Sequence, residues 1–178
     1  GIIVYPTDST YAIGCQMGDK KSLERIRALR RLDPKHNLTL LCAGLSELSS
    51  YSQVSNGAYR ILKSHTPGPF TFLLKATPEV PRRLQHPKRK TIGLRIPANT
   101  ILQSLIHTSG EPIMSTSLIL EGQSVALSDP KEFRAELGSL VDLIIDGGVR
   151  KGSDVIKFLC LGADFVGVGR PAVHGLIT

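Results

Sequence analysis

Short apolar runs alternate along the chain with longer segments in which apolar and polar residues recur at helical spacing. Residues 2–5 (IIVY) are apolar and mostly β-branched, and Pro6 ends the run, so a buried strand is expected there. Apolar residues three apart predict a helix over about 19–32, which Asp19 caps. Residues 38–42 form another short apolar run. The other expected strands are 70–74, 91–96, 112–117, 141–145 and 165–168, and the other expected helices are 45–50, 56–64, 99–107, 153–161 and one that begins near Asp129.

Helices and strands alternate in this pattern, but several strands are followed by hairpin-like turns. The combination favours an α/β fold with a twisted, mixed parallel and antiparallel sheet and flanking helices. A length of 178 residues without internal repeats or a low-complexity linker predicts a single domain over 1–178. No apolar run is long enough for a transmembrane helix, so no membrane partner is expected. Three cysteines without CxxC spacing and the lack of an export signal predict a reducing, cytoplasmic compartment.

The net charge of +7 is unevenly distributed. Residues 1–100 carry 16 Lys and Arg against 6 Asp and Glu, whereas residues 101–178 carry 6 against 9. A basic first half indicates a polyanionic partner or a phosphate-bearing ligand, although the same charge also favours solubility. The candidate nucleic-acid patch consists of Arg82, Arg83, Lys88, Arg89 and Lys90. Without interleaved aromatic residues it suits duplex RNA or tRNA better than single strands, and a solvated charge run is the alternative.

The sequence lacks the common catalytic motifs: it has no GxxxxGK[ST] loop, no GxGxxG, no HExxH and no GxSxG. Instead, hydroxyl groups and arginines gather at the expected ends of strands and of the first helix. They are Thr7, Ser9 and Tyr11, then Ser115, Thr116 and Ser117, together with Arg30, Arg31 and Arg95. Because such groups donate hydrogen bonds to negative oxygens, they suit a phosphate or carboxylate bound beyond the strand ends. The alternative is ordinary turn chemistry, in which Ser and Thr cap the backbone.

Several segments resemble the YrdC-like threonylcarbamoyl-adenylate synthases. They are IVYPTDSTYAIG at 3–14, TPGPFTFLLKA at 66–76, TIGLRIP at 91–97 and EPIMSTS at 111–117, while HNLTLLC at 36–42 and VDLIIDGG at 141–148 are nearer to the YciO branch. The resemblance implies that ATP, L-threonine and bicarbonate form threonylcarbamoyl-AMP and pyrophosphate, a reaction linked to tRNA modification. It also implies that Mg²⁺ enters with the phosphates. The alternative is a double-stranded RNA or tRNA-binding module with little or no catalysis.

The resemblance also assigns roles to residues. Thr7, Ser9 and Tyr11 fall where the family holds threonine, and Ser115 and Ser117 fall at its nucleotide. Arg95 matches the family arginine of a G-x-R-x-P strand, and Arg30 stands at the lysine of a K-x-R motif, so these two are the candidate catalytic residues.

Two positions depart from the family motifs. Leu32 replaces the arginine of K-x-R, for which Arg31 is the candidate substitute, and Ile119 replaces an asparagine. Both changes are typical of the YciO branch, and they predict binding with slow turnover.

The C-terminal segment 145–178 is atypical. After Gly148 the family motifs are expected to end, and residues 145–171 resemble the phosphate-binding segment of FMN-dependent α-hydroxy-acid oxidases. This resemblance implies a barrel-type strand-helix-strand unit, a possible chimera, and a residual anion site at Gly147, Gly148, Arg150 and Arg170. FMN itself is not favoured, because one such fragment cannot build an eight-stranded barrel. The favoured alternative is that these glycines only form tight turns.

Overall fold

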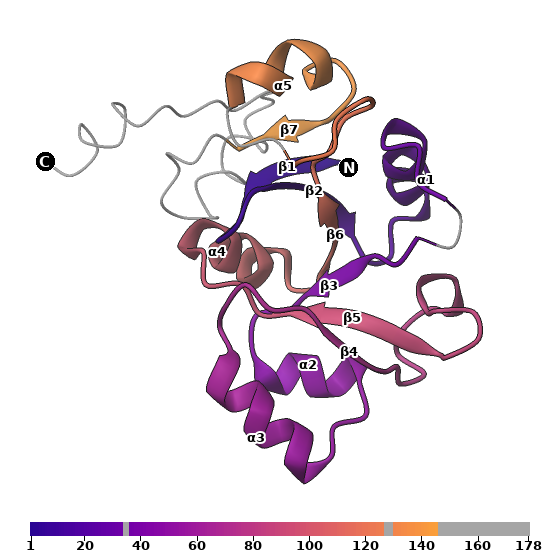
Figure 1. The fold of residues 1–178 in the computed structure, drawn as a ribbon, viewed down its shortest axis with the longest axis vertical. Coiled ribbons are helices and arrows are strands. Elements are labelled where there is room, and N and C mark those ends of the chain that lie inside the picture. The colour runs from indigo at the N-terminus through magenta and orange to yellow at the C-terminus, as the bar shows by residue number, and fades with distance from the viewer. Residues whose placement is uncertain (34–35, 127–129, 146–178) are drawn as a thin grey trace, which may run out of the picture.

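The computed structural model describes residues 1–33, 36–126 and 130–145 (Figure 1). The strands are β1 (Ile3–Pro6), β2 (Tyr11–Gln16), β3 (Thr39–Leu41), β4 (Phe72–Lys75), β5 (Thr91–Arg95), β6 (Ile113–Ser117) and β7 (Leu143–Ile144). The helices are α1 (Lys20–Leu29), α2 (Leu45–Tyr51), α3 (Asn56–His65), α4 (Thr100–Ser109), α5 (Pro130–Leu137) and the short 3₁₀ helix η1 (Arg82–Leu84). The elements expected at 153–161 and 165–168, and the barrel-type unit as a whole, lie outside the described residues.

One curved sheet contains all the strands of the described residues, in the order β4-β5-β3-β6-β2-β1-β7. β3 pairs with β5, and β1 with β7, in parallel, whereas the other neighbours are antiparallel. The predicted mixed sheet with flanking helices is therefore confirmed. No helix in the described part of the chain is long and apolar enough to span a membrane.

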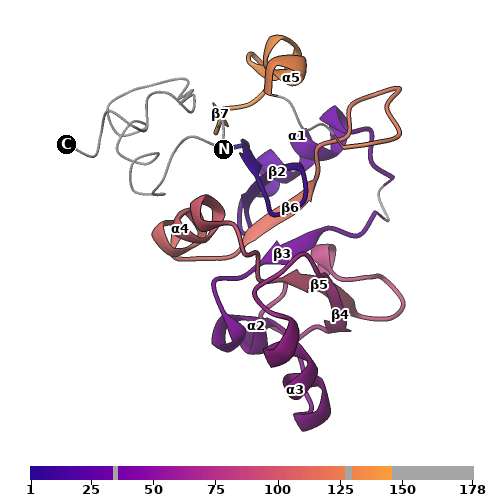
Figure 2. The ribbon, with the colours of Figure 1, turned by 60° about the vertical axis from the view of Figure 1, so that its left-hand side comes forward.

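The two faces of the sheet carry separate apolar cores. Ile2 and Val4 face a core to which α1, α2, α3 and α5 contribute, while Tyr5 faces a smaller core covered by α4. This alternation follows from the period of two along a strand. In Figures 1 and 2, α4 lies on one side of the curved sheet, and α1 lies across it on the other.

Two predicted elements need correction, and one strand was missed. The first helix ends at Leu29 rather than near residue 32, because Arg30 already closes the last turn and Arg31 has a positive φ of 45°. The strand expected at 70–74 begins at Phe72, and Phe70 stays 51% exposed in the preceding turn. β2 was not predicted at all. Its first five residues are all buried, so it lacks the alternation of polar and apolar positions that marks a half-exposed strand.

Candidate functional site

The turn between β1 and β2 is held by the hydroxyl of Thr7. Its Oγ1 donates to the carbonyl of Thr10 at 2.6 Å and accepts from the backbone N–H of Ser9 at 3.1 Å and of Thr10 at 3.2 Å. A side-chain hydroxyl that binds its own turn in this way fixes the local backbone. The turn therefore presents its side chains, Asp8 among them, in a defined orientation beside the end of β5.

Arg95, the last residue of β5, forms an ion pair with Asp8 from this turn. The two side chains are only 13% and 14% exposed. The second carboxylate oxygen of Asp8 accepts from the N–H of Ala98 at 3.1 Å, and Arg95 Nε donates to the carbonyl of Gly68 at 3.3 Å. Arg95 Nη1 has no hydrogen-bond partner among the described residues, so its two donors are free for a ligand.

Small residues lie side by side across the middle of this face. Gly93, Thr39, Ser115 and Gly14 are paired in register across β5, β3, β6 and β2. Residues paired directly across neighbouring strands share a face of the sheet. Because these side chains are small, they leave open space above the sheet next to the guanidinium of Arg95.

A cavity of about 80 Å³ lies over this floor. Its lining is dominated by hydroxyl groups and contains one cation; the residues are Thr7, Ser9, Thr10, Ala12, Thr39, Leu41, Thr71, Arg95, Ser115, Thr116 and Ser117. The structure thus brings together, from three separate segments, most of the residues that the sequence singled out. A cavity with many hydroxyl donors and a single guanidinium suits a small ligand with anionic oxygens.

Tyr11, Arg30 and Arg31 do not line this cavity. Tyr11 lies on the opposite face of the sheet, 92% buried, with its ring 5.0 Å from that of Phe133. Arg30 Nη1 donates to the carbonyl of Ile119, and burial lowers the pKa of this guanidinium. Arg31 is exposed and forms an ion pair with Glu121.

These contacts show what the two departures from the family motifs do locally. Leu32 packs, partly buried, against the larger core and cannot donate a hydrogen bond. Arg30 is engaged by the backbone of residue 119, where the family has an asparagine side chain. Both arginines after α1 therefore fasten the 119–121 segment rather than face the cavity.

Two threonines that line the cavity were not singled out from the sequence. Thr39 and Thr71 are each the single hydroxyl in an otherwise apolar run, and that contrast is the signal that would have found them. Asp8 lies in the 3–14 segment that resembles the family, but only the fold shows that it pairs with Arg95, 87 residues away.

Tyr5 also belongs to the surroundings of the cavity. Its side chain is fully buried, and its Oη has no hydrogen-bond partner among the described residues. Burial raises the pKa of Tyr5, and the nearby Ser115 lowers it by less, so the two groups are close without completing a hydrogen bond of good geometry.

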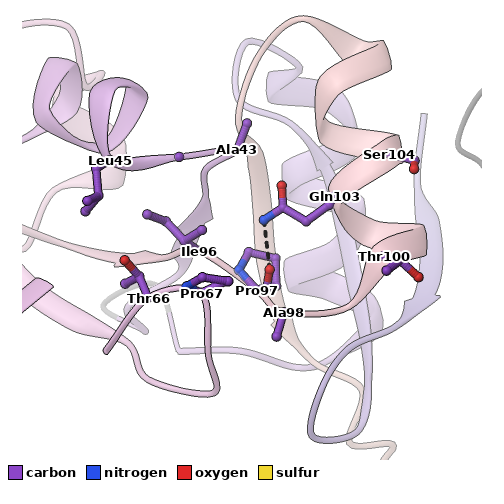
Figure 3. Close-up of a pocket in the computed structure, with 11 residues that line it drawn as sticks. Ala43, Leu45, Thr66, Pro67, Ile96, Pro97, Ala98, Thr100, Gln103 and Ser104 are labelled. Carbon is purple, nitrogen blue, oxygen red and sulfur yellow. Dashed lines mark hydrogen bonds between the residues drawn. The ribbon is translucent and has the colours of Figure 1, made fainter. Parts of the chain in front are cut away.

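A separate groove of about 550 Å³ lies beside the first turns of α4 (Figure 3). Its walls are mostly apolar and include Ala43, Leu45, Pro67 and Ile96, and the amide of Gln103 spans part of it by donating to the carbonyl of Pro97 at 2.8 Å. None of the predicted site residues in the described part of the chain lines this groove, so it is distinct from the hydroxyl-lined cavity.

The basic patch is exposed as predicted. All five of its side chains are exposed, and within the described ranges none of them forms a salt bridge. The patch begins in η1 and leads into β5, and Arg83 also lines a surface depression with Arg27 and Arg31 of the α1 region. The residual anion site expected at Gly147, Gly148, Arg150 and Arg170 lies outside the described residues.

Comparisons with known proteins agree on one family. The model of the Sua5/YciO/YrdC family, described as "Telomere recombination", matches residues 1–164. YciO of Escherichia coli (strain K12) is 56% identical over 148 residues, which are 83% of this chain and 72% of that protein. A threonylcarbamoyl-AMP synthase of Alkalilimnicola ehrlichii is 31% identical over 147 residues, 81% of this chain and 76% of that protein.

Solved structures show the same fold. The crystal structure of E. coli YciO matches with a TM-score of 0.78 at 54% identity and covers 85% of this chain and 73% of that one. Sua5 of P. abyssi, complexed with L-threonine, matches with a TM-score of 0.75 at 24% identity, over 82% of this chain and 43% of that one. The family match also continues to residue 164, beyond the point at which the family motifs were expected to end, and gives no support to a chimeric tail. The chain therefore belongs to the Sua5/YciO/YrdC family, on its YciO side.

Proposed function

We propose that this protein binds L-threonine in the hydroxyl-lined cavity and joins it, with bicarbonate and ATP, into threonylcarbamoyl-AMP. The observation that carries the proposal is the cavity itself, in which Arg95 and hydroxyl groups from β1–β2, β3 and β6 converge. The names of two relatives support it, since one is a threonylcarbamoyl-AMP synthase and another was solved with L-threonine.

The size of the cavity favours the amino acid over the nucleotide as its occupant. Its volume is about 80 Å³. Sites that enclose drug-sized ligands have volumes of roughly 300–1,000 Å³. A molecule as large as ATP cannot be enclosed in it, so the nucleotide extends outward from the rim. Ser117, which is exposed at the end of β6, belongs to that rim.

The proposed chemistry needs alignment rather than a protein nucleophile. The amine of L-threonine and bicarbonate give a carbamate and release water. A carbamate oxygen then attacks the α-phosphorus of ATP, and pyrophosphate leaves with the electron pair of the broken P–O bond. Transfer of this kind depends on positioning and on donors to the phosphoryl oxygens. Arg95 Nη1 and the hydroxyl groups supply such donors from fixed positions.

Mg²⁺ fits this site as a companion of the phosphates. The described residues contain no group of three or more His, Cys, Asp or Glu side chains that could hold a metal ion. Mg²⁺ commonly binds through substrate phosphates and water with few protein ligands. It would supply charge neutralisation on the pyrophosphate group.

We expect slow turnover, because the nearby arginines are already engaged. Arg30 binds the Ile119 carbonyl, Arg31 binds Glu121, and Arg95 is paired with Asp8. Little unpaired positive charge is therefore left for a triphosphate, and Leu32 adds none.

The test is pyrophosphate release from ATP, Mg²⁺ and bicarbonate with and without L-threonine. We expect release that requires L-threonine and that falls at least tenfold in Ser115→Ala. Ser104→Ala makes the same change in the separate groove beside α4 and should keep the wild-type rate. Release independent of L-threonine, or equal loss in both variants, would contradict the proposal.

Binding of double-stranded RNA is the second candidate function. It is favoured by the exposed basic patch, none of whose side chains forms a salt bridge with another described residue. Each phosphate contact contributes about 0.9 to the slope of log K against log salt. The double variant Arg82→Ala/Arg83→Ala removes two contacts, so the magnitude of this negative slope should decrease by about 2. The matched control is Lys20→Ala/Lys21→Ala, which removes two exposed charges from α1. An affinity that does not depend on salt would exclude this function.

A further inference from the structure

The buried hydroxyl of Tyr5 is the polar group that the proposed reaction leaves without a role. We propose that Tyr5 is a positioning residue: its hydroxyl donates to Ser115 Oγ and thereby directs the Ser115 proton toward an anionic oxygen of the ligand. The inference rests on the proposed function and deepens it, since it concerns how the same cavity recognises its ligand.

The strand register brings these groups together. Tyr5 of β1 pairs with Ala12 of β2, and Gly14 of β2 pairs with Ser115 of β6. Tyr5 Oη lies over Gly14, and Ser115 is the residue paired with Gly14 on the next strand, so the hydroxyl faces the strand position that carries Ser115. A Cβ at Gly14 would lie 2.4 Å from Tyr5 Oη and 2.5 Å from the Met114 carbonyl, so only glycine leaves room for the hydroxyl.

The hydroxyl is costly where it lies. Tyr5 is fully buried in the core under α4, and a phenylalanine would fill that core with the same ring. A buried hydroxyl without a partner destabilises the folded state, which makes such groups rare unless they serve a purpose. Ser115, the side chain beside it, is 6% exposed and lines the cavity. Tyr5 thus acts from behind the wall of the site.

Tyr5 is suited to donate rather than accept. Burial raises its pKa, so the phenol keeps its proton at physiological pH. A serine hydroxyl has one donor and two acceptor positions. When Tyr5 donates to Ser115 Oγ, the serine proton is free to point into the cavity, and hydrogen bonds in such a chain strengthen one another. The ligand group that meets Ser115 is then a hydrogen-bond acceptor, such as a carboxylate, carbamate or phosphate oxygen.

A double-mutant cycle tests the inference. L-threonine and Mg-ATP are titrated separately by calorimetry into the wild type, Tyr5→Phe, Ser115→Ala and the double variant. We expect Tyr5→Phe to weaken one of these ligands about threefold to tenfold, as the loss of one hydrogen bond does, while its melting temperature is unchanged or higher. In the Ser115→Ala background the same change should have no effect on binding. Tyr59→Phe, at an exposed tyrosine, is the matched control.

The outcomes separate this inference from the proposed function. Unchanged affinity for both ligands in Tyr5→Phe, or a loss that is equally large without Ser115, overturns the role of Tyr5 alone. Coupling between Tyr5 and Ser115 in a chain that binds L-threonine but forms no adenylate overturns the proposed reaction alone. A folded wild-type chain that binds neither ligand overturns both.

Discussion

Removing Asp8 should destabilise the protein far more than removing an exposed acidic residue. Asp8→Ala leaves the Arg95 guanidinium, 13% exposed, without its counter-ion, and it also removes the acceptor for the Ala98 N–H. Breaking one side of a buried ion pair costs about 3–5 kcal/mol. Because both side chains keep some exposure, we expect a loss of about 3 kcal/mol, the lower end of that range. For a chain of this size the melting temperature should fall by about 6 to 12 °C.

The assay is urea denaturation of the full chain followed by circular dichroism. The matched control is Glu121→Ala, which breaks the ion pair with Arg31, where the two side chains are 63% and 73% exposed. Exposed pairs contribute about 0–1 kcal/mol, so this variant should unfold near the wild-type midpoint. If both variants lose the same free energy at an unchanged m-value, the turn-to-strand ion pair does not hold the site together and the reasoning fails.

Three further predictions concern the rest of the fold. Asn99→Ala should lower the free energy of unfolding by about 1 kcal/mol in urea denaturation, because Asn99 Oδ1 caps α4 by accepting from the N–H of Leu102 at 3.0 Å. A loss below about 0.3 kcal/mol, a third of that of a typical cap, would contradict this role. Gly14→Ala should lower the melting temperature because its Cβ would overlap the Tyr5 hydroxyl, whereas Gly18→Ala, with no atom within 4 Å, should not; equal effects would refute the close approach. Burial raises the pKa of the Cys15 thiol from 9.0 to about 12, so the contribution of this thiol to stability is complete below pH 9 and is lost as the pH rises toward 12. Alkylation at pH 8, mapped by mass spectrometry, should therefore find Cys15 unmodified until the chain unfolds.

The apolar pattern predicted most of the elements because burial of one face is a local property of the sequence. β1, β3, β5 and β6 all follow from short apolar runs that turn residues interrupt. β2 is also buried, but Gly14 and Gln16 interrupt its apolar residues, so it lacks both the unbroken apolar run of β1 and the alternation of a half-exposed strand.

The composition of the cavity was predicted better than its geometry. The hydroxyl groups singled out at strand ends, Thr7, Ser9, Ser115 and Ser117, do line one cavity. Which face a side chain occupies depends on register, however, and one residue of difference puts Tyr11 on the wrong side of the sheet.

Long-range pairing explains why Asp8 was missed and why Arg30 does not line the cavity. Asp8 meets Arg95 across 87 residues, and Arg30 meets the backbone of residue 119 across 89. Neither contact leaves a mark on local spacing, so an arginine at the end of a strand or helix could be read as a free donor. The structure shows instead that Arg30 is engaged by a backbone carbonyl and that the charge of Arg95 is paired with Asp8, although Arg95 Nη1 keeps its donors for a ligand. This pairing of charge is the physical reason to expect slow turnover.

The most direct test of the proposed reaction uses bicarbonate labelled with the stable isotope ¹³C. The 178-residue chain is incubated with ATP, Mg²⁺, L-threonine and the labelled bicarbonate, and the products are analysed by mass spectrometry. The account predicts threonylcarbamoyl-AMP that carries the label, formed slowly by the wild type and not detectably by Ser115→Ala. A folded wild-type chain that yields no labelled adenylate would contradict the central claim.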